Sequence, residues 1–219
     1  MLPSLTVFTD GACEGNGQKH ARGGMGIHFP DGQLTDLAIP YTNGACTNQK
    51  TELLAILIAL QTIDREIGLS RVRVRLYTDS MYSINCTTKW VYAWLKNDWR
   101  TQKGTPVLNR EYIEPIYQLL SVNQINLIHV EAHTGGEDRH SVANHRADRL
   151  AVQGAALAGG QDLKEPRRTS MVAMEDQRCA ASPLVRCAAD VELVPPPRSK
   201  ASSRSRSSCN RTPTSVSKK

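Results

Sequence analysis

The 219-residue sequence lacks several features that would place it in a specialised class of protein. It contains no apolar run close to the roughly 20 residues that a membrane-spanning helix needs. No secretion signal precedes the first predicted strand, which begins at residue 5. Its six cysteines form no C-x-x-C pair, so a zinc site is not expected. These absences predict a reduced, soluble, intracellular protein of the cytoplasm, the nucleus or both.

Acidic and basic residues balance over most of the chain, so this part has no net charge. Residues 1–159 carry 15 Lys and Arg against 15 Asp and Glu, so the whole excess of +6 lies in residues 160–219. From residue 195 onward, a segment rich in Pro, Ser and Arg has seven basic residues and no acidic one. Such a composition cannot bury enough apolar surface to fold. We therefore predict a catalytic domain at residues 1–158 and a disordered basic tail at 159–219 that contacts nucleic acid or a targeting receptor.

Apolar segments of strand length and of helix length follow one another along the first part of the chain. Strands are predicted at residues 5–10, 23–29, 33–40, 72–78 and 125–131, and helices at 48–67, 81–96, 111–120 and 141–157. The first strands follow one another closely, with Pro30-Asp31-Gly32 as a hairpin turn. Helices separate the later strands. This order predicts an α/β domain with a five-stranded mixed sheet, an antiparallel meander and then parallel strands, flanked by helices. We expect the protein to be a monomer.

One predicted strand, 5–10, ends in an aspartate, Asp10, and another, 72–78, is followed directly by one, Asp79. Aspartate is disfavoured inside strands, so a single Asp10-Gly11 pair is ordinarily interpreted as a turn at a strand end. Its repetition at Asp79 favours a shared acidic site at one edge of the sheet. Glu52 lies in the first turns of a nearly apolar helix, where a carboxylate can simply favour the helix dipole. Asp148 lies on the closing helix, where an aspartate is normally solvated.

Together, these four carboxylates form a donor set made only of oxygen atoms. Such ligands suit Mg²⁺ or Mn²⁺, and clustered carboxylates repel one another unless a cation neutralises them. Two cations about 3.5–4 Å apart can activate a water molecule and stabilise a leaving oxygen on phosphorus. The residue types therefore indicate metal-dependent chemistry on a phosphate ester.

A pair of tryptophans, Trp90 and Trp94, lies one helical turn apart in the predicted helix 81–96, and Lys89 and Lys96 stand beside them. Core packing of an amphipathic helix is the ordinary interpretation of such tryptophans. A surface that stacks on bases and follows phosphates is the functional one.

The segments around these residues resemble, in order, the motifs of the type 1 ribonuclease H family. The motifs are Thr9-Asp10-Gly11-Ala12, Thr47-Asn48-Gln49-Lys50-Thr51-Glu52-Leu53, Tyr77-Thr78-Asp79-Ser80, His133-Thr134-Gly135 and Asn144-His145-Arg146-Ala147-Asp148-Arg149-Leu150-Ala151. The resemblance covers residues 5–156, and the tryptophan segment is similar to that of the eukaryotic-type enzymes. It implies an RNase H-like fold and an endonuclease that cuts the RNA strand of RNA–DNA hybrids. Such enzymes use two divalent metal ions, Mg²⁺ or Mn²⁺, and leave 5′-phosphate and 3′-hydroxyl ends.

The resemblance also implies a role for each matching residue. The catalytic, metal-binding carboxylates would be Asp10, Glu52, Asp79 and Asp148, and His133 would assist proton transfer or product release. Residues that read 2′-hydroxyls and base edges in the wide, shallow minor groove would be Asn16, Asn48 and Gln49. Thr47 and Asn109 would grip a DNA phosphate, and Trp90 and Trp94, joined by Tyr82, would line the channel for the DNA strand.

Three features depart from the family pattern. Ala45 stands where an arginine usually completes the phosphate pocket, which implies a looser grip on the DNA strand. His145 replaces the usual glutamate of the last motif. The loop after His133 is longer than usual and contains a second candidate histidine, His140.

Three alternative functions remain to be weighed against hybrid cleavage. The first is a catalytically weak nucleic-acid-binding module of the same fold, against which the presence of all four acids argues. The second is an integrase or a Holliday-junction resolvase, which the Thr47-Asn48-Gln49 triplet and the tryptophan pair disfavour. The third is a metal-dependent phosphatase, which would require an aspartate where Phe8 stands.

Overall fold

Five strands form one sheet in the computed structural model of the protein, which describes residues 1–131 and 138–159. The strands are β1 (Ser4–Glu14), β2 (Arg22–His28), β3 (Leu37–Pro40), β4 (Arg73–Thr78) and β5 (Ile125–His129). Their order in the sheet is β3-β2-β1-β4-β5. β2 is antiparallel to both β1 and β3, whereas β1, β4 and β5 run parallel. The predicted meander followed by parallel strands is confirmed.

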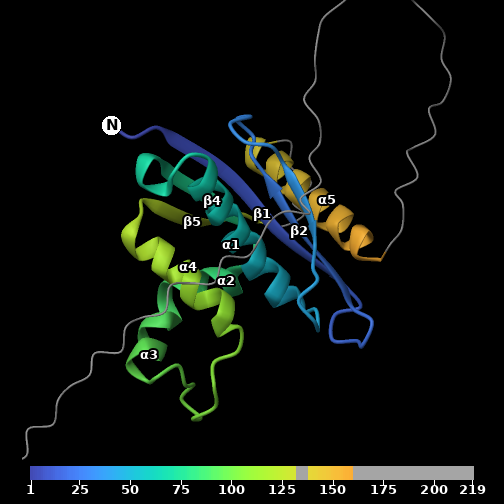
Figure 1. Cartoon of the computed structure of the whole chain (residues 1–219), viewed down its shortest axis with the longest axis vertical. Coiled ribbons are helices and arrows are strands. Elements are labelled where there is room, and N and C mark those ends of the chain that lie inside the picture. The colour runs from blue at the N-terminus through green and yellow to red at the C-terminus, as the bar shows by residue number, and fades with distance from the viewer. Residues whose placement is uncertain (132–137, 160–219) are drawn as a thin grey trace, which may run out of the picture. The chain divides into compact units, whose positions relative to one another are not determined.

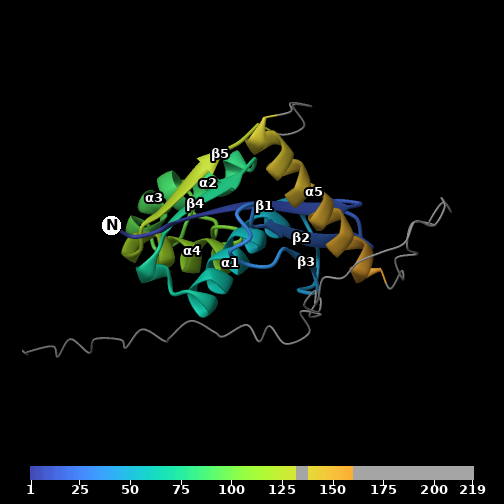
Figure 2. The same cartoon turned by 90° about the horizontal axis from the view of Figure 1, so that it is seen from above.

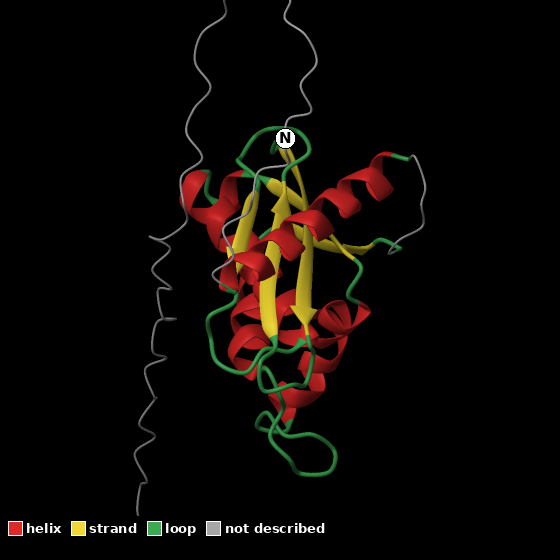
Figure 3. Cartoon of the chain, turned by 90° about the vertical axis from the view of Figure 1, so that its right-hand side faces the viewer, coloured by secondary structure: helices red, strands yellow, loops and turns green. Residues whose placement is uncertain are grey.

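Helices cover both faces of this sheet (Figure 1). They are α1 (Asn48–Glu66), the 3₁₀-helix η1 (Leu69–Arg71), α2 (Met81–Asn85), the π-helical turn η2 (Cys86–Trp90), α3 (Val91–Lys96), α4 (Arg110–Val122) and α5 (Arg139–Ala158). Seen from above, α1 and α4 lie on one side of the strands and α5 lies on the other (Figure 2). Figure 3 shows the same layers by secondary structure, with the strands between helices. None of the helices in the described ranges is long and apolar enough to cross a membrane.

The central helix, α1, begins and ends where the sequence indicates. The Thr47 hydroxyl accepts a hydrogen bond from the backbone N–H of Lys50 and so caps the first turn. At the other end, Gly68 has a positive φ of 90° and donates its N–H to the carbonyl of Ile63. Every position from Thr51 to Leu60 is buried, because the helix is enclosed by the sheet and α4. Glu52 is thus carried into the interior by the most deeply buried helix of the domain.

Helix α5 lies directly on β2 because that strand presents glycine to it. A Cβ atom on Gly26 would lie 2.0 Å from the carbonyl oxygen of Ala147 and 2.5 Å from the backbone nitrogen of Ala151. Only glycine leaves room for the helix backbone at this distance. Ahead of this contact, Ala143 and Ala147 pack on the stacked rings of Phe8 and Tyr77. The start of α5, and with it Asp148, is therefore set close to the sheet.

The predicted elements depart from the structure by more than two residues, or are divided, in three places. β1 does not end at Asp10 but continues to Glu14, because its antiparallel ladder with β2 extends beyond its parallel ladder with β4. β3 begins at residue 37 rather than 33. The predicted helix 81–96 is divided by the π-helical turn η2, which inserts extra backbone between α2 and α3.

The contact between β2 and α5 makes a first prediction. The substitution Gly26→Ala should lower the free energy of unfolding by about 2–3 kcal/mol or more, because the added methyl group would overlap the α5 backbone. Gly32→Ala is the matched control, since nothing lies within 4 Å of its added Cβ and only its positive φ of 66° is strained. That strain should cost about 1 kcal/mol. Urea unfolding midpoints measure both, and equal losses would contradict the close packing of α5 on β2.

Candidate active site

A cleft of about 550 Å³ opens where β1, β4, α1 and α5 come together. We call it the acidic cleft. Its lining residues are Asp10, Gly11, Ala12, Asn48, Gln49, Glu52, Asp79, Ser80, Met81, Tyr82 and Asp148. All four carboxylates predicted from the sequence therefore face one cavity. They come from four different elements and are brought together by the fold alone.

Three of the carboxylates form a tight group. Asp10, Glu52 and Asp79 each offer a carboxylate oxygen, and these oxygens all lie within 4.8 Å of one another. Asp79 directly follows β4, as predicted, while Asp10 lies in β1 just beyond the last residue paired with β4. The parallel strands thus deliver two aspartates to the same edge, although only one of them ends its strand.

Glu52 reaches this group because β1 and α1 touch at Gly11. A Cβ atom on Gly11 would lie 2.3 Å from the backbone nitrogen of Glu52, so no other residue fits without moving the helix. This contact puts the second turn of α1 against the strand that carries Asp10. The same glycine that suggested a turn in the sequence therefore serves as a contact surface for a helix.

The electrostatic environment of Glu52 is unfavourable for a lone carboxylate. Its residue is only 7% exposed, and its Oε2 atom has no hydrogen-bond partner among the described residues. Burial, and then the charges of Asp10 and Asp79, raise the pKa of Glu52 well above its usual range, and a backbone hydrogen bond from Gly11 opposes them. An orphaned oxygen beside two further carboxylates is the donor set that a hard divalent cation takes. The residues present fit such an ion.

Asp148 lines the same cleft but stands outside the group of three. It projects from α5, its side chain is 29% exposed, and its Oδ2 lies 3.7 Å from Nδ1 of His145. Its distance from the other acids depends on where α5 lies, since no strand carries it. Contacts that hold α5 therefore bear on the site.

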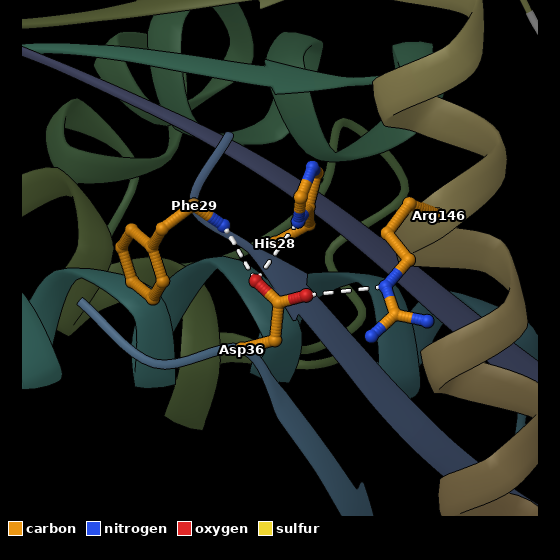
Figure 4. A network of polar contacts seen from close by, with 4 residues as sticks. All are labelled: His28, Phe29, Asp36 and Arg146. Carbon is orange, nitrogen blue, oxygen red and sulfur yellow. Dashed lines mark hydrogen bonds and ion pairs between the residues drawn. The ribbon is translucent and has the colours of Figure 1, made fainter. Parts of the chain in front are cut away.

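One such contact is a polar network around Asp36 (Figure 4). Asp36 Oδ1 accepts the backbone N–H of Phe29 at 3.0 Å and lies 2.8 Å from His28 Nδ1, while its Oδ2 accepts Nε of Arg146 at 3.1 Å. Burial alone would raise the pKa of Asp36, but the hydrogen bonds from Phe29, His28 and Arg146 outweigh it and lower the pKa. The network joins the β2–β3 connection to α5 two residues before Asp148.

A second ion pair joins the same two segments. Arg139, in the first turn of α5, contacts Asp31 in the turn that follows β2. Arg139 and Arg146 are two helical turns apart, so they lie on one side of the helix. The first half of α5 is thus held to the β2–β3 connection at two points.

Two of the three amide side chains predicted to read the substrate line the acidic cleft, and the third, Asn16, does not. Asn48 and Gln49 line it, and the backbone N–H of Asn48 donates to Oδ1 of Asn16 at 3.3 Å. The three residues therefore form a continuous exposed edge at the start of α1. Thr47 is used as the cap of that helix and is not among the lining residues.

The tryptophans line a second hollow, of about 620 Å³, together with Asn97, Arg100 and Lys103. Trp90 is 44% exposed and its ring contacts that of Trp94 edge-on, at 6.1 Å between centroids. Tyr82 lines the acidic cleft and also contacts Trp90, so it connects the two hollows. Trp90 therefore lies on the open surface, whereas Trp94 is half-buried and also packs against the core. Trp99, by contrast, is buried under Arg110.

Asn109 does not line either hollow. It is 9% exposed, has a left-handed φ of 60°, and donates from Nδ2 to the hydroxyl of Tyr82 at 3.0 Å. The structure therefore places it as a support for Tyr82.

The comparison with known proteins decides the family. The model of the RNase H family matches residues 3–156 of this chain. The chain belongs to the RNase H family. The expected type 1 assignment and the expected enzyme class, a ribonuclease H hydrolase, are confirmed by the relatives that follow.

The relatives include viral and mammalian RNase H proteins. A probable ribonuclease H of Acanthamoeba polyphaga mimivirus is 44% identical over 164 residues, which is 75% of this chain and 71% of the relative. Ribonuclease H1 of Rattus norvegicus is 38% identical over 73% of this chain and 53% of its own length. Ribonuclease H1 of Homo sapiens is 36% identical over 69% of this chain and 50% of its own length. This chain therefore spans about half the length of the mammalian relatives.

Solved structures confirm the predicted RNase H-like fold. LC9-RNase H1, a type 1 RNase H with the type 2 active-site motif, superposes with a TM-score of 0.57 at 27% identity, over 74% of this chain and 75% of that one. The foamy viral protease–reverse transcriptase in complex with an RNA/DNA hybrid superposes with a TM-score of 0.57 at 25% identity. That match covers 72% of this chain and 21% of the viral one.

The structure separates the two candidate histidines of this RNase H. His133 lies outside the described residues. The His140 ring stacks on Tyr77, with 4.8 Å between centroids, and is not among the residues that line the acidic cleft. His140 is thus an exposed residue of the first turn of α5 whose ring stacks on Tyr77.

The structure also shows the surroundings of two residues that depart from the family pattern, Ala45 and His145. Beside Ala45, the Lys50 ammonium donates to the Ala45 carbonyl at 3.1 Å, so a positive charge lies next to the position that lacks arginine. His145 is the imidazole near Asp148.

Sequence reasoning missed two groups of residues around the site. Ser80 lines the cleft and caps α2 by accepting the N–H of Ser83, a role that its position after a strand could have indicated. Asp36 and Arg146 hold α5, but they are 110 residues apart and no local pattern marks them as partners.

The raised pKa of Glu52 makes a second prediction. Because the folded state holds the Glu52 proton more tightly than the unfolded state does, stability falls as pH rises above the unfolded pKa of about 4.3. Glu52→Gln should therefore stabilise the metal-free protein at pH 7, by about 1.4 kcal/mol for each unit of the shift, and should have no such effect below pH 4. Urea unfolding in EDTA measures this. Glu66→Gln, at an exposed position, is the control, and a loss of stability at pH 7 in Glu52→Gln would contradict the assignment.

Proposed function

We propose that this chain hydrolyses the RNA strand of RNA–DNA hybrids as an endonuclease and leaves 5′-phosphate and 3′-hydroxyl ends. The observation that carries the proposal is the meeting of Asp10, Glu52 and Asp79 in one cleft, within 4.8 Å, in a chain of the RNase H family. Asn48 and Gln49 on the rim of that cleft support the choice of a hybrid as substrate. The mammalian relatives extend well beyond the matched region, so the activity is proposed for this chain on its own residues.

The carboxylates would hold two Mg²⁺ ions, or Mn²⁺ in their place. Asp10, Glu52, Asp79 and Asp148 are the residues of the cleft that would hold them. When bound, such a pair of ions activates a water molecule and stabilises the leaving oxygen at phosphorus. The protein contributes a cleft in which three carboxyl groups already lie together, so little rearrangement is needed to receive the ions.

Recognition of the hybrid would use the two hollows for its two strands. Asn16, Asn48 and Gln49 have the donors and acceptors to contact RNA 2′-hydroxyls and base edges in a wide minor groove. The exposed ring of Trp90, with Trp94 beside it, would hold the DNA strand, and Tyr82 connects the two positions. Thr47 would contribute to a contact with a DNA phosphate. Asn109 would contribute to the same contact indirectly, by holding the Tyr82 hydroxyl.

The charge distribution supports different roles for residues 1–159 and for the basic tail. Residues 1–159 carry equal numbers of acidic and basic groups, so the domain has no general attraction for a polyanion. The basic tail would add contacts to phosphates or to a targeting receptor. We propose a monomer of a reducing compartment, the cytoplasm or the nucleus, since Cys13, Cys46 and Cys86 are free thiols.

A third prediction tests the substrate and the metal. With Mg²⁺, the protein should cut the RNA of a labelled RNA–DNA hybrid at internal positions and leave RNA duplex and DNA duplex intact, because only the hybrid offers both strand types to the two hollows. EDTA should abolish cleavage. Gel analysis of the three substrates measures this, and efficient cleavage of DNA duplex would contradict the proposal.

The matched variants for that assay alter single carboxylates. Asp10→Asn and Asp79→Asn should each lower turnover at least about 1000-fold, which corresponds to about 4 kcal/mol of transition-state stabilisation. Glu66→Gln should retain normal turnover, since that side chain lies at the exposed end of α1. Near-normal activity of either aspartate variant would place the catalytic site elsewhere.

A fourth prediction concerns the histidines. His133→Ala should slow turnover by roughly 10- to 100-fold if the side chain assists proton transfer. His140→Ala should retain turnover but lower the thermal unfolding temperature, because its ring stacks on Tyr77. Single-turnover rates and melting curves of both variants distinguish these effects, and the reverse pattern would transfer the role to His140.

A further inference from the structure

Two cysteines meet beside the acidic cleft. Cys13 lies in β1, three residues after Asp10, and Cys46 directly precedes Thr47, the cap of α1. Their Sγ atoms are 3.0 Å apart, although 33 positions separate them in the sequence. Even two carbon atoms at optimal contact are about 3.5–4.0 Å apart, so the sulfur atoms are in unusually close contact.

Packing alone would not require this arrangement. A buried free cysteine usually behaves as a small apolar residue, and Cys46, at 4% exposure in the main core, fits that description. Cys13 differs because it is half-buried at the rim of the core and accessible to a reagent. The sulfur atoms would need to approach by only about 1 Å to reach the length of a disulfide.

We propose that Cys13 and Cys46 form a thiol modification site at which a low-molecular-weight disulfide, such as glutathione disulfide, generates an intramolecular disulfide. The proposal concerns this chain's own thiols and does not depend on the proposed nuclease activity. It also assigns different roles to the two residues, because only one of them is accessible.

The accessible residue reacts first. The Cys13 thiolate attacks one sulfur of glutathione disulfide, the S–S bond of the reagent breaks, and one glutathione leaves as a thiolate. Cys46 then loses its proton to solvent and attacks the Cys13 sulfur, which releases the second glutathione. Two protein thiols are oxidised and one glutathione disulfide is reduced to two glutathiones.

The second step is the slow one. Burial, followed by the hydrogen bond with Cys13, raises the pKa of Cys46 to about 12, so very little of it is thiolate at neutral pH. The short distance compensates, since Cys46 is already in contact with the sulfur that it attacks. We therefore expect closure over minutes to hours, with a mixed disulfide on Cys13 as the intermediate.

The product would tie β1 to the start of α1. It would close a loop that contains β2 and β3, and it would hold together the segments that carry Asn16 and Asn48, which already share a hydrogen bond. A disulfide that closes a loop of this length raises the unfolding temperature of a domain of this size by about 5–10 °C.

Peptide mapping of the full chain tests the proposal. The reduced protein is incubated with glutathione disulfide and unfolded in denaturant, the remaining thiols are alkylated there, and proteolytic fragments are analysed by mass spectrometry. The expected product is a cross-linked pair of peptides containing Cys13 and Cys46, two hydrogens lighter than the separate thiols, with Cys86 alkylated. The unfolding temperature should rise in the same sample and return on addition of a reductant.

Two variants separate the steps. Cys46→Ala should stop at a glutathione adduct on Cys13, and Cys13→Ser should leave Cys46 fully alkylated with no rise in unfolding temperature. The Cys13→Ser result remains informative if the buried Cys46→Ala variant does not fold. Full alkylation of both cysteines in the wild-type protein, a stable adduct without closure, or a cross-link from Cys13 to a cysteine of residues 160–219 would each overturn the proposal.

Discussion

The contact between β1 and α1 at Gly11 is the constraint on which the site depends. A side chain there would collide with the backbone of α1, so glycine allows the helix to lie directly on the strand. The consequence is electrostatic as well as steric. The contact brings a buried carboxylate, Glu52, to two others, and its raised pKa shows that the assembled site is unfavourable for the metal-free charged form. The fold thus gathers three carboxyl groups in a position where only a cation makes their full ionisation favourable.

A second tier of contacts determines the place of the fourth carboxylate. Asp148 is carried by a helix, and that helix is held by glycine on β2 and by Asp31 and Asp36 in the β2–β3 connection. The meander therefore does more than extend the sheet. Strand β2 and the β2–β3 connection contact α5 directly. Because α5 carries Asp148, this side of the sheet influences the position of the fourth carboxylate in the cleft.

Much of this could be predicted from the sequence, and the failures have physical reasons. The element types follow from local periodicity, and the acids are recognisable because carboxylates at Asp10 and Asp79 interrupt apolar strands. The continuation of β1 past Asp10 could not be foreseen, since it depends on pairing with β2 rather than on local preference. The Asp36–Arg146 contact joins residues 110 positions apart, and the separation of Asp148 from the other acids depends on the resting position of a helix. These are tertiary quantities with no local signal.

The π-helical turn between α2 and α3 has a consequence for the exposed tryptophans. In an α-helix each residue advances by about 100°, so one extra residue in a turn changes the phase of everything after it. Before the turn, the segment buries Ser83 and Ile84, and within it, it buries Cys86 and Thr87. After the turn, Val91 is buried, while Trp90, the last residue of the turn, and Trp94 both line the second hollow. The extra residue of the π-helical turn therefore sets the angle of α3, which carries Trp94, relative to α2, which is anchored in the core. Lengthening or shortening that turn would rotate α3, and Trp94 with it, relative to α2 without substituting either tryptophan.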